Sequence, residues 1–315
     1  MASQTERWIN HIYVRLQVKG RPEQTLSLAE AFEYLEEQDV AGTTDATLFE
    51  DRWIIQLAAL DRDTHPGFIS VLFLGIYKNR AEAVYGDINT LNLRKAPKSD
   101  TEGGAISAHL LIDLTGDSTA QGCRAVLEDV EGLSRSRIIP FLRWLFEKFV
   151  TFVEEGDNGD QLKTNIIGDI VLDRSIAEQL EDAQLVAVDV FKKARNSTID
   201  RTLEYYEKTR LIEYKPVSPV KGSKASDLIR EILERTPRDK YPETRIRIKE
   251  PAGNERTVAV DREKTDVLTA AFQLRTLLRD LNPPVDEATQ TITKHLIVEM
   301  KKALIAPSKA KKGGG

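Results

Sequence analysis

The chain has 315 residues, of which 41% are hydrophobic and 30% are charged, and its formal net charge at pH 7 is -5. This composition predicts a soluble, globular protein, and the length exceeds that of most domains with a single core. The single cysteine, Cys123, excludes an intramolecular disulfide and a multi-cysteine metal site, and the sequence has neither a secretory signal nor a run of 18 apolar residues, so we expect a cytoplasmic protein.

The first 191 residues alternate strand-like runs with two helices. Apolar side chains at every second position from Trp8 to Lys19 predict a half-buried strand. Ser27 precedes a run with helical periodicity and predicts a capped helix. The runs RWIIQLAALD, ISVLFLGIY, AISAHLLIDLT and CRAVLEDVEG then predict an antiparallel meander, and a second helix is expected after Ser134. The predicted class is α+β, an antiparallel sheet with packed helices.

The remaining residues predict a smaller α+β lobe. A helix is expected directly after Phe191, and Ser226 is expected to cap a shorter one. Two runs that flank the sequence PAGN predict a β-hairpin, namely 244–249 and 257–260. Apolar residues at helical spacing predict two terminal helices, over 264–281 and 285–304.

The sign of the net charge changes near residue 191. Residues 1–191 contain 18 lysine and arginine residues against 32 acidic ones, whereas residues 192–315 contain 27 against 18. This change predicts an acidic α+β domain over 1–191, a basic α+β lobe with C-terminal helices over 192–304, and a disordered tail over 305–315. A basic half hidden under an acidic total is a feature of some nucleic-acid-binding proteins, because lysine and arginine hold phosphates.

The basic half contains the candidate binding residues. Alternation in the predicted hairpin directs Ile246 and Ile248 to one face and cations to the other. Strand residues two positions apart are about 7 Å apart, which is close to the spacing of successive phosphates. Few aromatic residues lie among these cations, so we expect double-stranded DNA, bound largely without sequence preference. The candidate nucleic-acid-binding residues are Lys192, Lys193, Arg195, Arg201, Arg245, Arg247, Lys249 and Arg256.

An enzymatic alternative rests on Asp189 and on the pattern Glu213-Tyr214-Lys215. In restriction-type nucleases an aspartate and a glutamate on adjacent strands hold Mg²⁺, and a lysine polarises the attacking water. The pattern is common, so a charged end of a helix explains it as well. The four histidines are scattered without metal-ligand spacing and no phosphate-binding loop occurs, so we expect no metal, no cofactor and no small-molecule substrate.

Two segments resemble known phage-exclusion proteins in their layout. The segments AQLVAVDVFKKARNSTIDRTLEYY and IRIKEPAGNERTVAVDREKTDVLTAAFQLRTLLRDL, preceded by GDIVLDRSIAEQLEDA, resemble the C-terminal half of the RexA family. The chain is also similar in size and style to the KwaB family, the DNA-associated component of an anti-phage system. The resemblance implies a homodimeric DNA-binding sensor that works with a membrane protein encoded nearby, and it assigns binding to Lys192, Lys193, Arg195, Arg245, Arg247 and Lys249.

The function expected from the sequence is therefore non-catalytic DNA binding in a bacterial or prophage anti-phage system. A protein-interaction or scaffold subunit is the first alternative, because a split of charge can also mediate contacts between proteins. A metal-dependent nuclease is the second.

Overall fold

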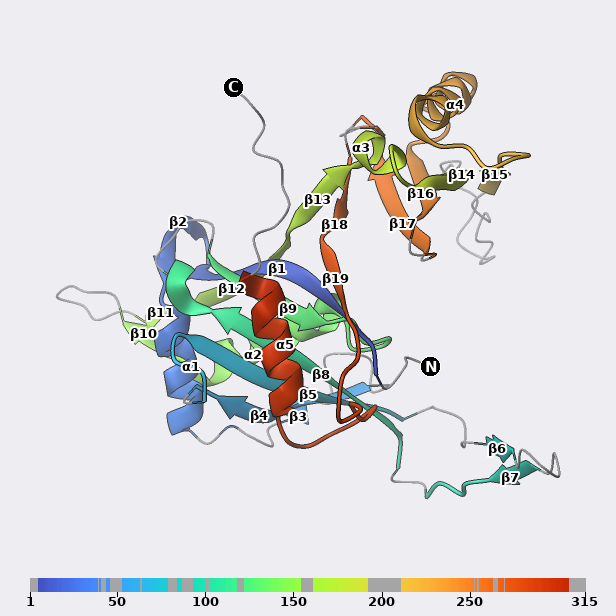
Figure 1. The fold of residues 1–315 in the computed structure, drawn as a ribbon. Coiled ribbons are helices and arrows are strands. Elements are labelled where there is room, and N and C mark those ends of the chain that lie inside the picture. Colours follow the sequence, from blue (N-terminus) through green and yellow to red (C-terminus); the bar gives the residue numbers. More distant parts are fainter. Residues whose placement is uncertain are drawn as a thin grey trace, which may run out of the picture. The chain divides into compact units, whose positions relative to one another are not determined.

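The chain forms two compact units in a computed structural model (Figure 1). The main unit is built from residues 1–171 and 274–308, and the inserted unit is built around residues 172–273. Both units combine strands with helices, which confirms the α+β class. The residues that the structure describes are 5–38, 40, 44–45, 53–62, 64–78, 84–86, 93–99, 102–117, 122–153, 161–191, 211–251, 253, 255–262, 266–268 and 270–305.

A nine-stranded sheet is the frame of the main unit. Its strands are β1 (Arg7–Val18), β2 (Arg21–Leu26), β3 (Thr44–Asp45), β4 (Trp53–Asp61), β5 (Phe68–Tyr77), β8 (Gly104–Asp113), β9 (Cys123–Glu128), β12 (Thr164–Ile170) and β19 (Arg275–Leu278). The order along the sheet is β12-β1-β9-β8-β5-β4-β3, with β2 and β19 also paired to β1. All of these pairings are antiparallel, which confirms the predicted meander.

Helices cover both faces of this sheet. On one face α1 (Leu28–Glu37) and α2 (Arg135–Phe149) pack over Ile12, Val14 and Leu16 of β1. On the other face α5 (Lys294–Ile305) packs over Ile9. The Oγ atom of Ser27 accepts a hydrogen bond from an amide in the first turn of α1, as the capping pattern predicts. No helix within the described residues is long and apolar enough to cross a membrane.

Helix α2 protects the outer edge of β12. Arg135 donates a hydrogen bond to the carbonyl of Gly168, and Arg143 donates one to the carbonyl of Ile166 at 3.2 Å. An edge strand exposes unpaired backbone groups, so side chains that bind its carbonyls block pairing with another chain. A Cβ atom on Gly168 would lie 2.5 Å from Cδ1 of Ile139, so only glycine permits this close approach.

The inserted unit leaves the sheet at one point along β1. Both β12 and β19 pair with the same side of β1, one after the other, so that Ile170 lies opposite Ile12 and Arg275 lies opposite Asn10. Between these pairs, the amide of His11 donates to the carbonyl of Leu274 at 3.0 Å, and the carbonyl of His11 accepts from the amide of Val171 at 3.1 Å. Two segments far apart in sequence therefore share the position of one strand.

The inserted unit has its own core. Its elements are β13 (Leu172–Ser175), α3 (Ile176–Leu180), β14 (Gln184–Phe191), β15 (Leu211–Tyr214), α4 (Gly222–Arg235), β16 (Glu243–Lys249), β17 (Glu255–Asp261) and β18 (Ala271–Gln273). Four strands form a sheet in the order β15-β14-β16-β17, and β13 pairs with β18. Val188 and Ile246 of this sheet pack with Ile229 of α4. The predicted β-hairpin is confirmed as β16 and β17.

Short ribbons complete the described part of the fold. They are β6 (Val84–Gly86) with β7 (Leu93–Lys95), and β10 (Phe152–Val153) with β11 (Gln161–Leu162), and a 3-10 turn, η1, spans Leu114–Gly116.

The structure differs from four expectations from the sequence. The helix expected over 285–304 begins only at Lys294. The unit boundaries at 171/172 and 273/274 differ from the boundary expected at 191, because β14, which ends there, pairs with β16 beyond it. The helix expected over 264–281 is absent from the described residues of that span, which instead form β18 and β19. Ser226 does not cap a helix, because α4 begins at Gly222 and buries this serine. The tail from residue 306 onward lies outside the described residues.

Candidate nucleic-acid interface

Strand β16 carries the centre of the candidate interface. Ile246 and Ile248 are fully buried, whereas Arg245 and Lys249 are exposed and Arg247 is half-buried. The predicted alternation is therefore confirmed, and helix α4 packs on the side of the isoleucines. We call the opposite side of the four-stranded sheet, where Arg245, Arg247 and Lys249 lie, the outer face.

The strand register decides which other charged side chains share the outer face. Directly paired residues project to the same side of a sheet. Asp189 lies opposite both Arg245 and Glu213, while Glu255 lies opposite Lys249. The charged strand residues of the outer face are Asp189, Glu213, Glu243, Arg245, Arg247, Lys249, Glu255 and Asp261. Carboxylates therefore outnumber cations on these strands, which the sequence pattern of β16 alone does not reveal.

Arg256, the eighth candidate residue, does not lie on the outer face. It lies opposite Ile248 in the hairpin and is only 9% exposed. Its guanidinium binds Asp173 at 3.2 Å and Glu250 at 3.0 Å, and it lies 4.7 Å from the centre of the Phe272 ring. Arg256 thus ties β17 to β13 and β18 inside the inserted unit, and its charge is already balanced.

The structure brings together the three residues of the enzymatic alternative. Asp189 and Glu213 are direct neighbours on β14 and β15, and Nζ of Lys215 lies 3.0 Å from Oε2 of Glu213. Arg247 contributes the fourth side chain, since its guanidinium binds Oδ1 of Asp189 at 3.2 Å and also Oε1 of Glu213. The hydrogen bond from Lys215, followed by that from Arg247, lowers the pKa of Glu213 below its ordinary value of 4.5.

This cluster does not fit a metal centre as it stands. The guanidinium of Arg247 bridges the two carboxylates and takes the place in which they would hold a divalent cation. Two cations of the chain balance the two carboxylates, so no further positive charge is needed. Within the described residues, no group of three or more histidine, cysteine, aspartate or glutamate side chains is arranged to hold a metal ion.

Two further cations of the outer region remain open to solvent. Arg245 lies 4.4 Å from the centre of the Phe191 ring and pairs with Glu243 at 3.2 Å, but its side chain is 47% exposed. Lys249, at the end of β16, is also exposed. With Lys215, whose side chain is 61% exposed, they form a set of three cations that solvent reaches directly. We call Lys215, Arg245 and Lys249 the exposed cations.

The other four candidate residues cannot be placed. Lys192, Lys193, Arg195 and Arg201 lie outside the described residues, and β14 ends at Phe191 just before them. Their contribution to the interface stays a prediction.

The net charge of the inserted unit is close to zero. Residues 172–273 contain 20 lysine and arginine residues against 19 acidic ones, a net charge of +1. A boundary at residue 191 leaves Asp173, Glu178, Glu181, Asp182 and Asp189 outside the basic half, although the structure puts them in the same unit. The strong contrast in net charge therefore appears only when the chain is divided at residue 191. It is not a property of the inserted unit.

A small cavity of the inserted unit lies at the C-terminal end of α4. Its volume is about 260 Å³, and both acidic and basic side chains line it. The guanidinium of Arg262, on the wall of this cavity, already donates hydrogen bonds to the carbonyls of Leu233, Thr236 and Tyr241. This arginine caps the carbonyl end of α4 and holds the turn after β17 against it.

The comparisons with known proteins leave the family open. No protein-family model matches the chain, and no curated protein matches it.

Proposed function

We propose that the inserted unit binds the phosphate backbone of double-stranded DNA through its outer face, without sequence preference and without catalysis. The observation that carries this proposal is the exposure of Lys215, Arg245 and Lys249 on and beside one strand face. Exposed ion pairs contribute little to stability, so Arg245 and Lys215 can exchange their carboxylate partners for phosphates. Arg247, bound by two carboxylates, instead stabilises the face.

The composition of the outer face limits the strength of this binding. Each phosphate neutralised on duplex DNA contributes a slope of about -0.9 in log affinity against log salt. The exposed cations therefore support a slope of roughly -3, and affinity in the non-specific range of about 10⁻⁴ to 10⁻⁶ M. The surrounding carboxylates oppose tighter binding by repulsion.

The resemblance to the RexA and KwaB families supports a role for this binding in anti-phage defence, in the cytoplasm and as a homodimer. The membrane protein expected as a partner belongs to the same proposal. The DNA-binding test below requires neither the membrane protein nor knowledge of the oligomeric state.

A matched pair of double variants tests the proposal. Arg245→Glu with Lys249→Glu reverses two exposed cations, while Lys221→Glu with Lys224→Glu makes the same change of charge at the start of α4, whose buried side packs on the other face of the sheet. Fluorescence anisotropy of a labelled duplex, measured over a range of salt concentrations, gives affinity and slope. We expect the outer-face variant to lose about two units of slope and the α4 variant to retain binding.

Two results would overturn the proposal. One is equal binding by the outer-face variant and the unmodified protein, and the other is no binding of the unmodified protein at low salt. Half of the binding samples contain Mg²⁺, and gel electrophoresis of these samples shows whether the labelled duplex is cleaved. Cleavage that Glu213→Ala abolishes would replace the binding proposal with the nuclease alternative.

A protein-interaction function is the second candidate. The near-neutral inserted unit and the acidic majority on the strands of the outer face favour it, because a mixed surface suits a folded protein partner better than a polyanion. Absence of DNA binding in the salt titration, together with retention of a protein partner that the outer-face variant loses, would support this candidate.

A further inference from the structure

The chain between β19 and α5 crosses the main unit without forming a helix or a strand. We call residues 285–293 of this segment the C-terminal strap. It contacts β1 through Arg7, and it contacts β8 where that strand extends beyond its pairing with β9. Residues 110–113 of β8 pair with β9, whereas residues 104–109 pair with β5 alone among the described strands. The strap and the side chain of Glu128 supply partners for the backbone groups that β9 leaves open.

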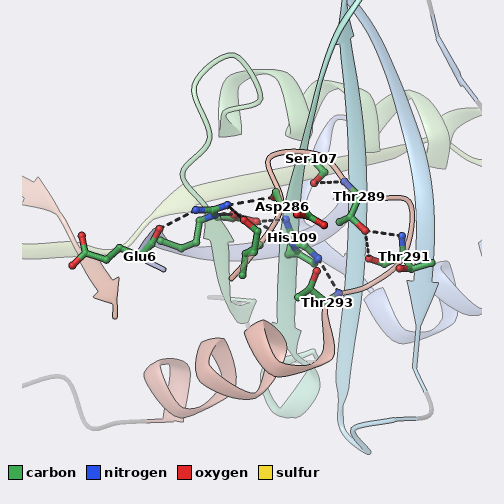
Figure 2. A network of polar contacts seen from close by, with 10 residues as sticks. Glu6, Ser107, His109, Asp286, Thr289, Thr291 and Thr293 are labelled. Carbon is green, nitrogen blue, oxygen red and sulfur yellow. Dashed lines mark hydrogen bonds and ion pairs between the residues drawn. The ribbon is translucent and has the colours of Figure 1, made fainter. Parts of the chain in front are cut away.

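A buried polar network fixes the strap in this place (Figure 2). The amide of Ser107 donates to the carbonyl of Glu287 at 3.0 Å, and the Oγ atom of Ser107 accepts from the amide of Thr289 at 3.1 Å. Two residues along β8, the amide of His109 donates to Oε2 of Glu128 at 3.2 Å. Arg7 donates to the carbonyl of Val285 at 2.6 Å. The bonds of Ser107 and Arg7 hold the strap against β8 and β1. The bond to Glu128 provides an acceptor for the amide of His109, which β9 does not pair.

The ring of His109 joins Glu128 to the C-terminal strap. It is fully buried, and its Nδ1 atom lies 2.9 Å from Oε2 of Glu128. Its Nε2 atom lies 3.2 Å from the backbone nitrogen of Thr293. A backbone amide can only donate, so Nε2 must accept, and the proton of the neutral ring must be on Nδ1, where it is donated to Glu128. The contact between Nε2 and Thr293 therefore requires the neutral ring.

Protonation reverses the polarity at one end of this arrangement. A second proton on Nε2 points at the amide hydrogen of Thr293, so that two donors face each other in a buried place. The bond from Nδ1 to Glu128 survives, because both charge states of the ring donate there. The charged side chains of the network are Glu128 on β9 and, at 2.8 Å from its Oε1 atom, Arg7 on β1; Asp286 and Glu287 contribute backbone carbonyls to the network.

We propose that His109 is a proton-sensitive latch that holds the C-terminal strap and the first turn of α5 against β8 while its ring is neutral. The carbonyl of Thr293 accepts the amide of Ile297, so Thr293 belongs to the first turn of α5 as well as to the latch. Protonation of the ring releases Thr293 and loosens this turn. Ser107 and Arg7 bind backbone groups of Val285, Asp286, Glu287 and Thr289 without using the imidazole, so we expect this end of the strap to remain docked.

Hydrogen exchange measured by mass spectrometry tests the latch. Exchange rates of peptides covering 289–300 are compared at pH 7.5 and pH 5.5 after correction for the intrinsic effect of pH. Loss of one buried hydrogen bond predicts a fall in protection of about tenfold at the lower pH. The control variant is His109→Gln, whose amide can donate to Glu128 and accept from Thr293 but does not titrate, so its protection should not change with pH. Peptides from α2 are an internal control and should not change in either protein.

A second variant protects the test against a failure of His109→Gln to fold. Thr293→Pro removes the donated hydrogen and keeps the imidazole, so protection of 294–300 should be low at both pH values. The proposal is overturned if the unmodified protein keeps equal protection at pH 7.5 and 5.5. It is also overturned if either variant shows the same fall with pH as the unmodified protein.

Discussion

The amide of Leu274 donates a hydrogen bond to the carbonyl of Val171 at 2.7 Å, although the whole inserted unit lies between them in sequence. This bond closes the line of backbone contacts along β1 where the chain leaves β12 and returns to β19. The chain therefore leaves and re-enters the main unit at two residues, Val171 and Leu274, that are bonded to each other.

We predict that the main unit folds without the inserted unit. Replacing residues 172–273 by Asn-Gly turns the bond between Val171 and Leu274 into that of a two-residue turn, the shortest loop that this spacing permits. Circular dichroism during thermal unfolding should show a single cooperative transition with strand-rich structure. A variant that lacks such a transition would show that the inserted unit stabilises the main unit beyond this junction.

Gly168→Ala should destabilise the protein by about 1–3 kcal/mol, because the added methyl group overlaps Ile139 in the interface between β12 and α2. Urea denaturation measures the change. Ile139→Ala removes the overlapping atoms, so the double variant should be less destabilised than the sum of the single changes by about 1 kcal/mol or more. If the two changes in the free energy of unfolding simply add, the overlap with Ile139 is not the cause of the destabilisation by Gly168→Ala.

Lys215→Ala should raise the pKa of Glu213 toward 4.5, since the hydrogen bond from Lys215 is the largest cause of its lowering. Carbon-13 NMR of the labelled carboxylate measures this titration, with Lys224→Ala as the control on α4. Because the pKa is lowered by folding, the carboxylate contributes stability above its unfolded pKa, and this contribution disappears as the pH falls through the folded value. An unchanged titration in Lys215→Ala would contradict the geometry of the cluster.

Cys123 should be inert in the folded protein. Burial, assisted by the charge of Asp117, raises the pKa of its thiol from 9.0 to about 12. A thiol reagent at pH 8 should label the unfolded chain completely and the native protein only at the rate of unfolding. The raised pKa also means that this thiol stabilises the fold at neutral pH and that its contribution decreases between pH 9 and 12. Rapid labelling of the native protein would place Cys123 at the surface.

Local patterns in the sequence predicted some elements well and others wrongly. The alternation in β16 and the cap of α1 were predictable because both depend on neighbouring residues. The side on which Arg256 lies was not, since it depends on the register across the turn, and a shift by one residue moves a side chain to the other face. The span 264–281 has helical spacing, but β19 within it pairs with the distant strand β1, and such pairing overrides local propensity.

The candidate site was partly predictable for the same reason. The sequence identified Asp189, Glu213 and Lys215 as partners in one site. The structure joins the two carboxylates through Arg247, which the sequence had assigned to a phosphate, and Lys215 binds Glu213. Only the pairing of β14 with both β15 and β16 shows that these predictions concern one cluster.

The shared strand position on β1 also constrains how the chain is made. During synthesis, β1 and β12 leave the ribosome before the inserted unit, and β19 follows only after a further 102 residues, those of 172–273. At elongation rates of about 5 to 20 residues per second, this delay is roughly 5 to 20 s. For that time the first residues of β1 lack their partner on one edge, and the face that α5 will cover is open to solvent. A nascent chain of this protein therefore exposes an apolar surface and an unpaired edge, the features that chaperones recognise.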